Sequence, residues 1–411
     1  MSGPGLSPEL HRRRTALFLL FGLPGLVIAS WVARSPDVRD LIHASTDQMG
    51  LVLFGVSVGS MTGVLASSSL IARFGVRSVV GAGSASTVLS LPVIGLGAEL
   101  HVAAVVACGL GLFGLGLGVA DVALNLEAAA AEGDSGVPVL PPMHGCFSLG
   151  TTLGAITGVG CALTGVPVGA HLGVIAALGA VVAASQVRYL SPHTGRRSTR
   201  VGPDPAPAYE RRSWPDPRLL LIGVIALAVG LGEGSAIDWL PLVMVDGHDA
   251  SVATGAAVFA GFAACMAVGR FAGGRVVRRL GRAGAVRWTT AAAAAGIGCI
   301  ALVDSLPVVT LGVVLWGLGI SLGFPVAISA AGDSAYGGSN AAARVSFVAV
   351  MGYVSLLTGP PTLGFVGEHH GLRAALLLPL ALLVLAAVLS PALDPPRRVR
   401  RSTALATVDA D

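Results

Sequence analysis

The sequence is poor in charged residues and contains no lysine at all. Charged residues make up 12% of the 411 residues and hydrophobic residues 54%, with a mean hydropathy of +0.79. An ordinary soluble domain carries about 25% charged residues, because its surface must face water. This composition excludes most soluble proteins and predicts a chain whose solvent is lipid.

The five cysteines are odd in number and show no C-x-x-C spacing, which excludes a disulfide framework and a zinc site. We expect no metal ion and no cofactor. The sequence also lacks a glycine-rich phosphate loop, a nucleophile and base at catalytic spacing, and a soluble segment large enough for an active site, so we expect no enzyme. It has no basic patch with interleaved aromatic residues, so we expect no nucleic-acid partner.

Twelve apolar windows are long enough to cross a bilayer, whose core needs about 20 residues per helix. These windows cover residues 15–34, 48–71, 77–97, 102–128, 142–166, 170–190, 218–241, 251–275, 284–303, 306–331, 341–366 and 371–393. The arginines at 12–14 imitate the start of a signal peptide, but the run that follows is long enough to span, and we expect it to be retained. The sequence predicts an all-α integral membrane protein of twelve transmembrane helices.

A linker rich in arginine and proline, residues 191–217, separates the sixth and seventh spans. It divides the chain into an N-terminal six-helix half (1–190) and a C-terminal six-helix half (218–396), followed by a tail (397–411). With the linker and both termini in the cytoplasm, 22 of the 26 arginines lie inside and three outside. The positive-inside rule therefore predicts a multi-pass protein of the cell inner membrane with cytoplasmic termini.

The two halves share an internal repeat at an offset of 206 residues. The corresponding pairs are Arg73 with Arg279, Gly75 with Gly281 and Gly63 with Gly269. Parallel repeats of this kind place a substrate site between the halves and alternate its access by rocking.

The loops after the second and eighth spans, Ser68 to Arg77 and Gly274 to Arg282, resemble the G-x-L-a-D-R-x-G-R-R signature of the major facilitator superfamily. With the twelve spans and the repeat, the resemblance covers essentially the whole chain and implies two pseudo-symmetric six-helix halves. It assigns a conformational role to a set of loop residues, namely Arg73, Gly75, Arg77, Arg279 and Gly281. The signature Asp is Ala72 in one copy and Arg278 in the other, so the charge pairing ascribed to that Asp does not carry over.

A second, narrower resemblance lies in the fourth span. The segment from Asp121 to Leu126 is similar to the E-x-A-x-N-P segment of fucose-permease-like sugar:proton symporters, with Asp121 at the acidic position and Asn125 at the Asn. The resemblance points to an uncharacterised bacterial branch near that group. The proline is replaced by Leu126, and the first span lacks the acidic residue that such symporters carry.

Ionisable residues inside a span cost about 2.5–3.5 kcal/mol on insertion scales and mark functional sites. Asp121 and Asn125 share one helix face, and glycines just before them let neighbouring helices approach closely. We expect Asp121 and Glu233 to couple protons. Asp238 lies about 140° around the helix from Glu233, so the two share a face only if the helix breaks at the glycines nearby. Alternatively, Glu233 or Asp238 only stabilises the structure. The same alternative applies to Asp121, as a hydrogen bond between helices.

Further candidates for the substrate cavity are Asn125, Asp238, His144, Trp316 and Tyr353. His144 suits a proton relay by its ordinary pKa, although an interfacial histidine bonded to a carbonyl is commoner. Arg270, which we group with the conformational residues, is expected to snorkel or to bridge the halves. We expect Trp31 and Trp239 in the outer interfacial belt.

These observations predict a secondary transporter that moves a small solute by alternating access, coupled to protons. The partners are a small-molecule solute, protons and the lipid bilayer, and we expect a monomer. One alternative is a drug:proton antiporter that exports amphiphiles, against which the fifth span offers glycines without the antiporter Gly-Pro motif. Another is a receptor that binds without transport, which leaves the same sequence pattern.

Overall fold

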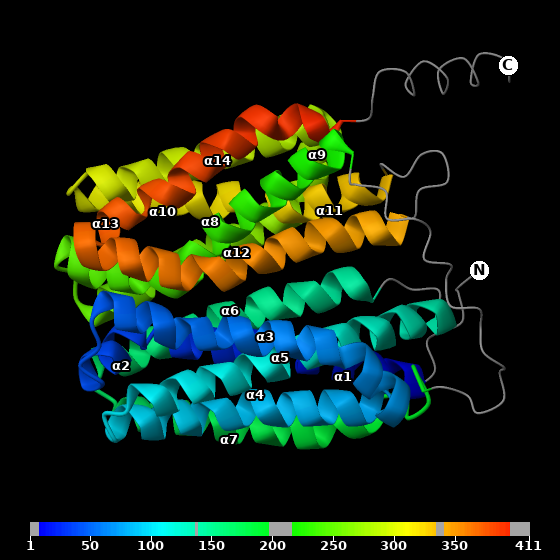
Figure 1. The fold of residues 1–411 in the computed structure, drawn as a ribbon. Helices are drawn as coiled ribbons and strands as arrows, with labels where there is room; N and C mark the ends of the chain where they lie inside the picture. The colour runs from blue at the N-terminus through cyan, green and yellow to red at the C-terminus, as the bar shows by residue number, and fades with distance from the viewer. Residues whose placement is uncertain (1–7, 136–138, 197–215, 334–340, 395–411) are drawn as a thin grey trace, which may run out of the picture. The chain divides into compact units, whose positions relative to one another are not determined.

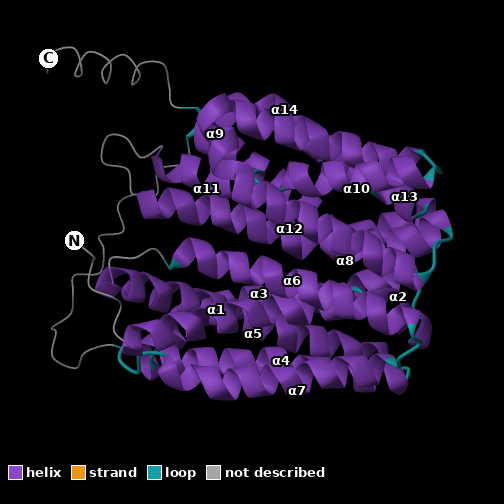
Figure 2. Cartoon of the chain, turned by 180° about the vertical axis from the view of Figure 1, so that it is seen from behind, coloured by secondary structure: helices purple, strands orange, loops and turns teal. Residues whose placement is uncertain are grey.

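The computed structural model describes residues 8–135, 139–196, 216–333 and 341–394, and every regular element in these ranges is helical (Figure 1, Figure 2). The helices before the predicted linker are α1 (Pro8–Val32), α2 (Ser35–Leu41), α3 (Thr46–Phe74), α4 (Val76–Glu99), α5 (Ala103–Ser135), α6 (Leu140–Leu163), α7 (Val168–Gln186) and the short 3₁₀ helix η1 (Val187–Tyr189). Those after it are α8 (Pro217–His248), α9 (Val252–Leu302), α10 (Leu306–Ile320), α11 (Gly323–Asp333), α12 (Ala341–His370), α13 (Leu372–Ala375), α14 (Leu377–Leu389) and η2 (Ser390–Leu393).

Eleven helical segments of the described chain are long and apolar enough to cross a membrane. The number is one below the twelve predicted spans because α9 contains two of them. Its 51 residues would extend for about 75 Å, far beyond the roughly 30 Å of a bilayer core. Gly281 interrupts α9 with φ 72° and ψ 174°, between the predicted spans 251–275 and 284–303. The predicted all-helical membrane fold is confirmed.

The internal repeat is visible in the backbone. Gly75, between α3 and α4, has φ 80° and ψ 161°, close to the values at Gly281 in the second copy. A positive φ of this size favours glycine, because a Cβ would clash with the backbone. Within the spans, the side chain missing at Gly63 would meet the backbone oxygen of Leu115, and that at Gly269 would meet Ser321. Leu115 and Ser321 are themselves 206 residues apart, so the repeat extends to a helix–helix contact.

The chain packs as two compact units. The first contains the described residues of Met1–Tyr209, Ala236–Ala264 and Leu357–Ala375, and the second those of Glu210–Ser235, Cys265–Leu356 and Leu376–Asp411. In the first unit α3 and α4 both pack on α5, α7 packs on α4, and α1 packs on α6 (Figure 1, Figure 2). Most of the predicted linker and the whole predicted tail lie outside the described residues, and the proposed boundaries of the two halves stay predictions.

Glycines bring α3 and α5 into backbone contact, as the sequence predicts for the segment before Asp121. A Cβ at Gly114 would overlap the backbone oxygen of Val56, and one at Gly118 would overlap that of Ser60. In lipid, where apolar burial contributes little, such close backbone approach is a main source of helix association. The fourth span is thereby held rigidly against the second.

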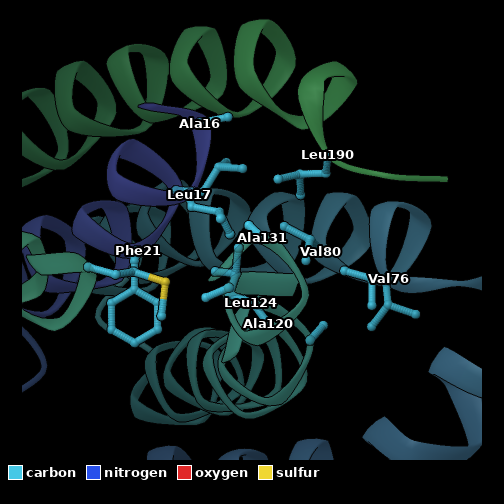
Figure 3. Packing of buried hydrophobic residues seen from close by; sticks show 14 of the residues in the cluster. Ala16, Leu17, Phe21, Val76, Val80, Ala120, Leu124, Ala131 and Leu190 are labelled. Atoms are coloured by element: carbon cyan, nitrogen blue, oxygen red, sulfur yellow. The ribbon is translucent and has the colours of Figure 1, made fainter. Parts of the chain in front are cut away.

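An apolar cluster fills the first unit beside these helices. Leu17 and Phe21 of α1, Val80 of α4, and Ala120 and Leu124 of α5 belong to it (Figure 3). These side chains are at most 5% exposed, so the segment of α5 that carries Asp121 has a buried apolar side.

The prediction that Trp31 and Trp239 lie in an interfacial belt is wrong. Their side chains are only 2% and 1% exposed, because both pack inside the protein rather than against lipid. Position at the end of an apolar run does not reveal which way a side chain faces. Of the tryptophans in the described ranges, Trp288, 67% exposed, is the one that faces outward.

Candidate functional site

A chain of polar side chains links α5 to α6 in the first unit. Asp121 and Asn125 lie one turn apart on α5, and the Asn125 amide nitrogen donates to the Asp121 backbone oxygen at 2.8 Å and to its carboxylate Oδ1 at 3.2 Å. The Nε2 atom of His144 on α6 lies 3.2 Å from Oδ1 of Asn125. Because the Asn125 amide group donates to Asp121, its oxygen is free to accept from His144. The structure thus joins three of the predicted site residues.

The solvent exposure of these three side chains increases from Asp121 to His144. Asp121 and Asn125 are half-buried, whereas His144 is exposed. The Phe21 ring of α1 meets the His144 ring edge-on, with centroids 4.7 Å apart. Three helices therefore position the group, and the side chain at its histidine end is exposed.

Asp121 has no arginine partner among the described residues. A carboxylate within a span needs a counter-ion, hydrogen bonds or a proton to offset the loss of water. Within the described residues, the only side-chain hydrogen bond to the carboxylate is the neutral one from Asn125. Proton binding is therefore the neutralisation that the geometry leaves open.

Glu233 is in the opposite electrostatic situation. Its Oε1 accepts from Arg270 Nη2 of α9 at 2.8 Å, in the second unit. The two side chains are 23% and 33% exposed, so the pair is accessible rather than sealed. Arg270 thus joins two helices of the predicted C-terminal half and does not bridge the halves.

The helix break that would bring Glu233 and Asp238 onto one face does not occur. The helix runs continuously from Pro217 to His248, through the glycines around Glu233. Glu233 and Asp238 therefore lie on different faces of one helix. Asp238 is half-buried and belongs to the first unit.

Two predicted aromatic cavity residues lie in the second unit with Glu233. Trp316 of α10 is fully buried, and its indole nitrogen donates to the Gly232 backbone oxygen at 3.2 Å. It braces α8 next to Glu233. Tyr353 on α12 is half-buried. Their roles as substrate contacts stay predictions.

The signature-like loops present arginines at the helix ends. The Arg73 guanidinium lies 5.1 Å from the centre of the Phe74 ring, and Arg77 is half-buried. In the second copy Arg279 and Gly281 are both exposed. In the described ranges no carboxylate lies in ion-pair contact with these three arginines, as expected for loops that lack the signature Asp.

Sequence reasoning missed a buried ion pair at the end of α5. Glu127 is fully buried, and its Oε1 accepts from Arg13 Nε of α1 at 2.7 Å and from the Ser191 backbone nitrogen at 2.8 Å. Arg13 also bonds Asp134 at 2.7 Å. In the sequence, Arg13 is one of the arginines that set the orientation, and nothing there pairs it with Glu127. The one available signal was Glu127 itself, a carboxylate inside a long apolar window.

Sequence reasoning also missed a second set of polar contacts, which joins distant segments at the end of the first unit opposite Glu127. Arg39 of α2 pairs with Asp246 of α8 and, at 2.7 Å, with Asp40. Burial opposes the charge of Arg39, yet hydrogen bonds to both carboxylates hold its pKa above the ordinary value. The Thr46 backbone nitrogen at the start of α3 donates to Glu368 Oε2 of α12 at 2.8 Å.

Helices α3 and α12 also approach each other closely at two glycines. A Cβ at Gly50 of α3 would lie 2.8 Å from the Pro360 backbone oxygen of α12, and one at Gly364 would lie 2.9 Å from Gly50 Cα. The first half of the sequence is thus packed tightly against segments from the second half within this unit.

In the described ranges no group of three or more His, Cys, Asp or Glu side chains could hold a metal ion. The comparisons with known proteins agree with a transport fold. A model of the Major Facilitator Superfamily matches residues 16–343. The chain belongs to this superfamily. It is therefore a secondary transporter that binds a small solute within the membrane, and not an enzyme.

The curated relatives have the same length and class. An uncharacterised MFS-type transporter of Yersinia pestis is 29% identical over 373 residues, covering 90% of this chain and 92% of the relative. An uncharacterised transporter of Sinorhizobium fredii is 30% identical over 379 residues, covering 91% and 96%. The chain is thus similar to bacterial superfamily members over nearly all of its length.

Solved structures share the fold at low sequence identity. A mutant of the nucleoside transporter NupG aligns with a TM-score of 0.73 at 11% identity, covering 93% of this chain and all of that chain, 100%. A bacterial homologue of the human lysosomal transporter Spinster, in an inward-facing and unoccupied conformation, aligns with a TM-score of 0.71 at 15% identity, covering 94% and 97%. At these identities the likeness shows the fold alone.

Proposed function

We propose that the protein is a proton-coupled transporter that moves a small polar solute by alternating access, with Asp121 as the proton carrier. The observation that carries this proposal is the hydrogen-bonded series Asp121, Asn125 and His144, in which a carboxylate inside a span has no arginine partner among the residues that the structure describes. A carboxyl that can be neutralised only by a proton changes its charge when its access to water changes.

In the proposed cycle, His144 exchanges protons with water at its exposed face and Asn125 orients the Asp121 carboxylate. Glu233 contributes to coupling through its ion pair with Arg270. When a solute or a proton binds one of the two side chains, the other loses its counter-ion. Asp238, Trp316 and Tyr353 are the proposed solute contacts. The similarity of the Asp121 segment to fucose-permease-like symporters supports symport of a polar solute.

The proposed setting is the bacterial inner membrane, in which a monomer of two six-helix halves has both termini in the cytoplasm. The distribution of arginine supports this orientation. The contacts of Arg39 with Asp246 and of Thr46 with Glu368 then lie at the outer ends of the helices. They support a state closed toward the outside, one of the two states that alternating access requires.

The test is proton movement driven by solutes in proteoliposomes, with a panel of sugars, nucleosides, organic acids and amphiphilic drugs. We expect a polar solute to drive proton uptake, and Asp121→Asn to abolish it while solute binding remains. The matched control is Asp134→Asn, the same change on the same helix at a side chain that is 60% exposed.

Three outcomes would contradict the proposal. Unchanged proton movement in Asp121→Asn would remove Asp121 as the carrier. A response to amphiphiles alone would indicate a drug antiporter. Specific binding without counterflow of labelled solute would indicate a receptor that does not transport.

A further inference from the structure

A cavity in the second unit lies between α9 and α14 and shares no residue with the proposed site. Its volume is about 720 Å³. The α9 side consists of small residues and the α14 side of aliphatic ones, with one arginine at the end. The lining residues are Arg287, Ala291, Ala294, Ala295, Gly298, Leu380, Val384, Ala387 and Val388.

This groove has a polar mouth and a narrow apolar end. At the mouth, Arg287 Nε donates to Ser390 Oγ at 3.3 Å. At the other end, a Cβ on Gly298 would lie 3.6 Å from Leu380 Cδ1, so the two helices converge there. The groove walls remain open between these points, since Val384 and Val388 are 47% and 67% exposed.

The length of the groove matches one leaflet of a bilayer. Arg287 and Gly298 are eleven residues apart on α9, about 16 Å at 1.5 Å per residue. Half of a bilayer core is about 15 Å thick. The exposed Trp288 beside Arg287 is the kind of residue that lies at headgroup depth, which places the mouth at the membrane surface.

The mouth of the groove carries the positive charge of Arg287. Arg287 is exposed and forms no ion pair within the described ranges, whereas the nearby Arg282 is paired with Asp333. Arg275, Arg278 and Arg279, which precede Gly281 on α9, are also exposed but do not line the groove. Basic pockets between transmembrane helices on the cytoplasmic side attract anionic headgroups.

We propose that this groove binds an anionic phospholipid of the inner leaflet, with an acyl chain along α9 and α14 and the headgroup phosphate on Arg287. The guanidinium supplies donors to the phosphate oxygens, and the small residues of α9 make room for the chain. The proposal does not depend on proton coupling or on the identity of the transported solute.

The experiment uses the full-length protein purified in detergent and a phosphatidylglycerol probe with a photoreactive diazirine in its acyl chain. Competition with unlabelled phosphatidylglycerol and phosphatidylcholine measures headgroup selectivity, and peptide mass spectrometry maps the crosslinks. We expect crosslinks on Ala295, Val384 and Val388, and stronger competition by phosphatidylglycerol.

Two variants and one control separate headgroup from chain. Arg287→Ala should weaken phosphatidylglycerol binding about fivefold, as for one basic side chain facing an anionic headgroup, and remove the preference over phosphatidylcholine. Ala295→Leu should fill the groove and lower crosslinking by both lipids. Arg275→Ala removes an exposed arginine outside the groove and should leave binding unchanged.

The proposal is overturned by equal competition of the two lipids in the unaltered protein, or by equal losses in Arg287→Ala and Arg275→Ala. The two arginine variants keep the test decisive even if Ala295→Leu fails to fold.

Discussion

At the residue scale, Glu127 shows what a single buried charge requires. Its side chain has no exposed surface, and its second carboxylate oxygen has no hydrogen-bond partner among the described residues. Among the described residues, Arg13 and the Ser191 backbone nitrogen therefore provide the hydrogen bonds that offset the loss of water around the Glu127 carboxylate. We expect Glu127→Ala to lower the free energy of unfolding by about 3 kcal/mol, because it leaves the mostly buried Arg13 without its shielded partner. Denaturant unfolding in detergent measures the change.

The control for this prediction is the other partner of Arg13. Asp134 is 60% exposed, so water screens its ion pair, and Asp134→Ala should cost less than about 1 kcal/mol. Equal losses in the two variants would contradict the burial argument. The ion pair between Arg13 and Glu127 also shows a limit of sequence reasoning. The two residues are separated by 114 positions, and no local sequence pattern joins them.

At the scale of the element, glycine spacing decides how closely helices approach. Gly150 of α6 lies against α1, where a Cβ would overlap the backbone oxygen of Gly22, whereas nothing lies within 4 Å of a Cβ at Gly160. We expect Gly150→Ala to destabilise the protein by about 1–3 kcal/mol, because a rigid backbone must move to admit the methyl group. Gly160→Ala on the same helix should be neutral or slightly stabilising. Thermal unfolding in detergent compares the two, and equal midpoints would contradict close packing as the reason for glycine at 150.

Elements were the most predictable level of this structure. Apolar windows locate the spans because the thickness of the bilayer sets their length. The repeat could be found because Gly75 and Gly281 are required by the same backbone conformation. The direction of side chains could not be predicted as well, since Trp31, Trp239 and Trp316 are buried by helices that are distant in the sequence. Whether α8 is continuous could not be predicted either, because glycines permit a break without requiring one.

At the scale of the whole molecule, the candidate site was predicted in part. Asp121 and Asn125 share a helix face, so helical periodicity alone brings them together, but His144 joins them only through the packing of α6. Glu233 was identified by its cost in lipid, whereas its partner Arg270 was assigned elsewhere. Pairings such as Thr46 with Glu368, 322 positions apart, follow from tertiary structure and leave no local sequence signal.

The last prediction concerns the contacts that would close the outer side in the proposed orientation. Asp246→Asn removes the ion pair between Asp246 and Arg39, whose side chains are 30% and 15% exposed, respectively. We expect this change to favour the outward-open state by about 1 kcal/mol, or about fivefold in population. The readout is labelling from outside by an impermeant maleimide at Met49→Cys in a cysteine-free background, since Met49 is fully buried beside Gly50. Labelling should accelerate about fivefold. Asp40→Asn, which removes the neighbouring carboxylate within α2, should leave the rate unchanged, because its bond to Arg39 does not join separate helices. Equal rates in the two variants would show that the pair between Arg39 and Asp246 does not hold the outer side closed.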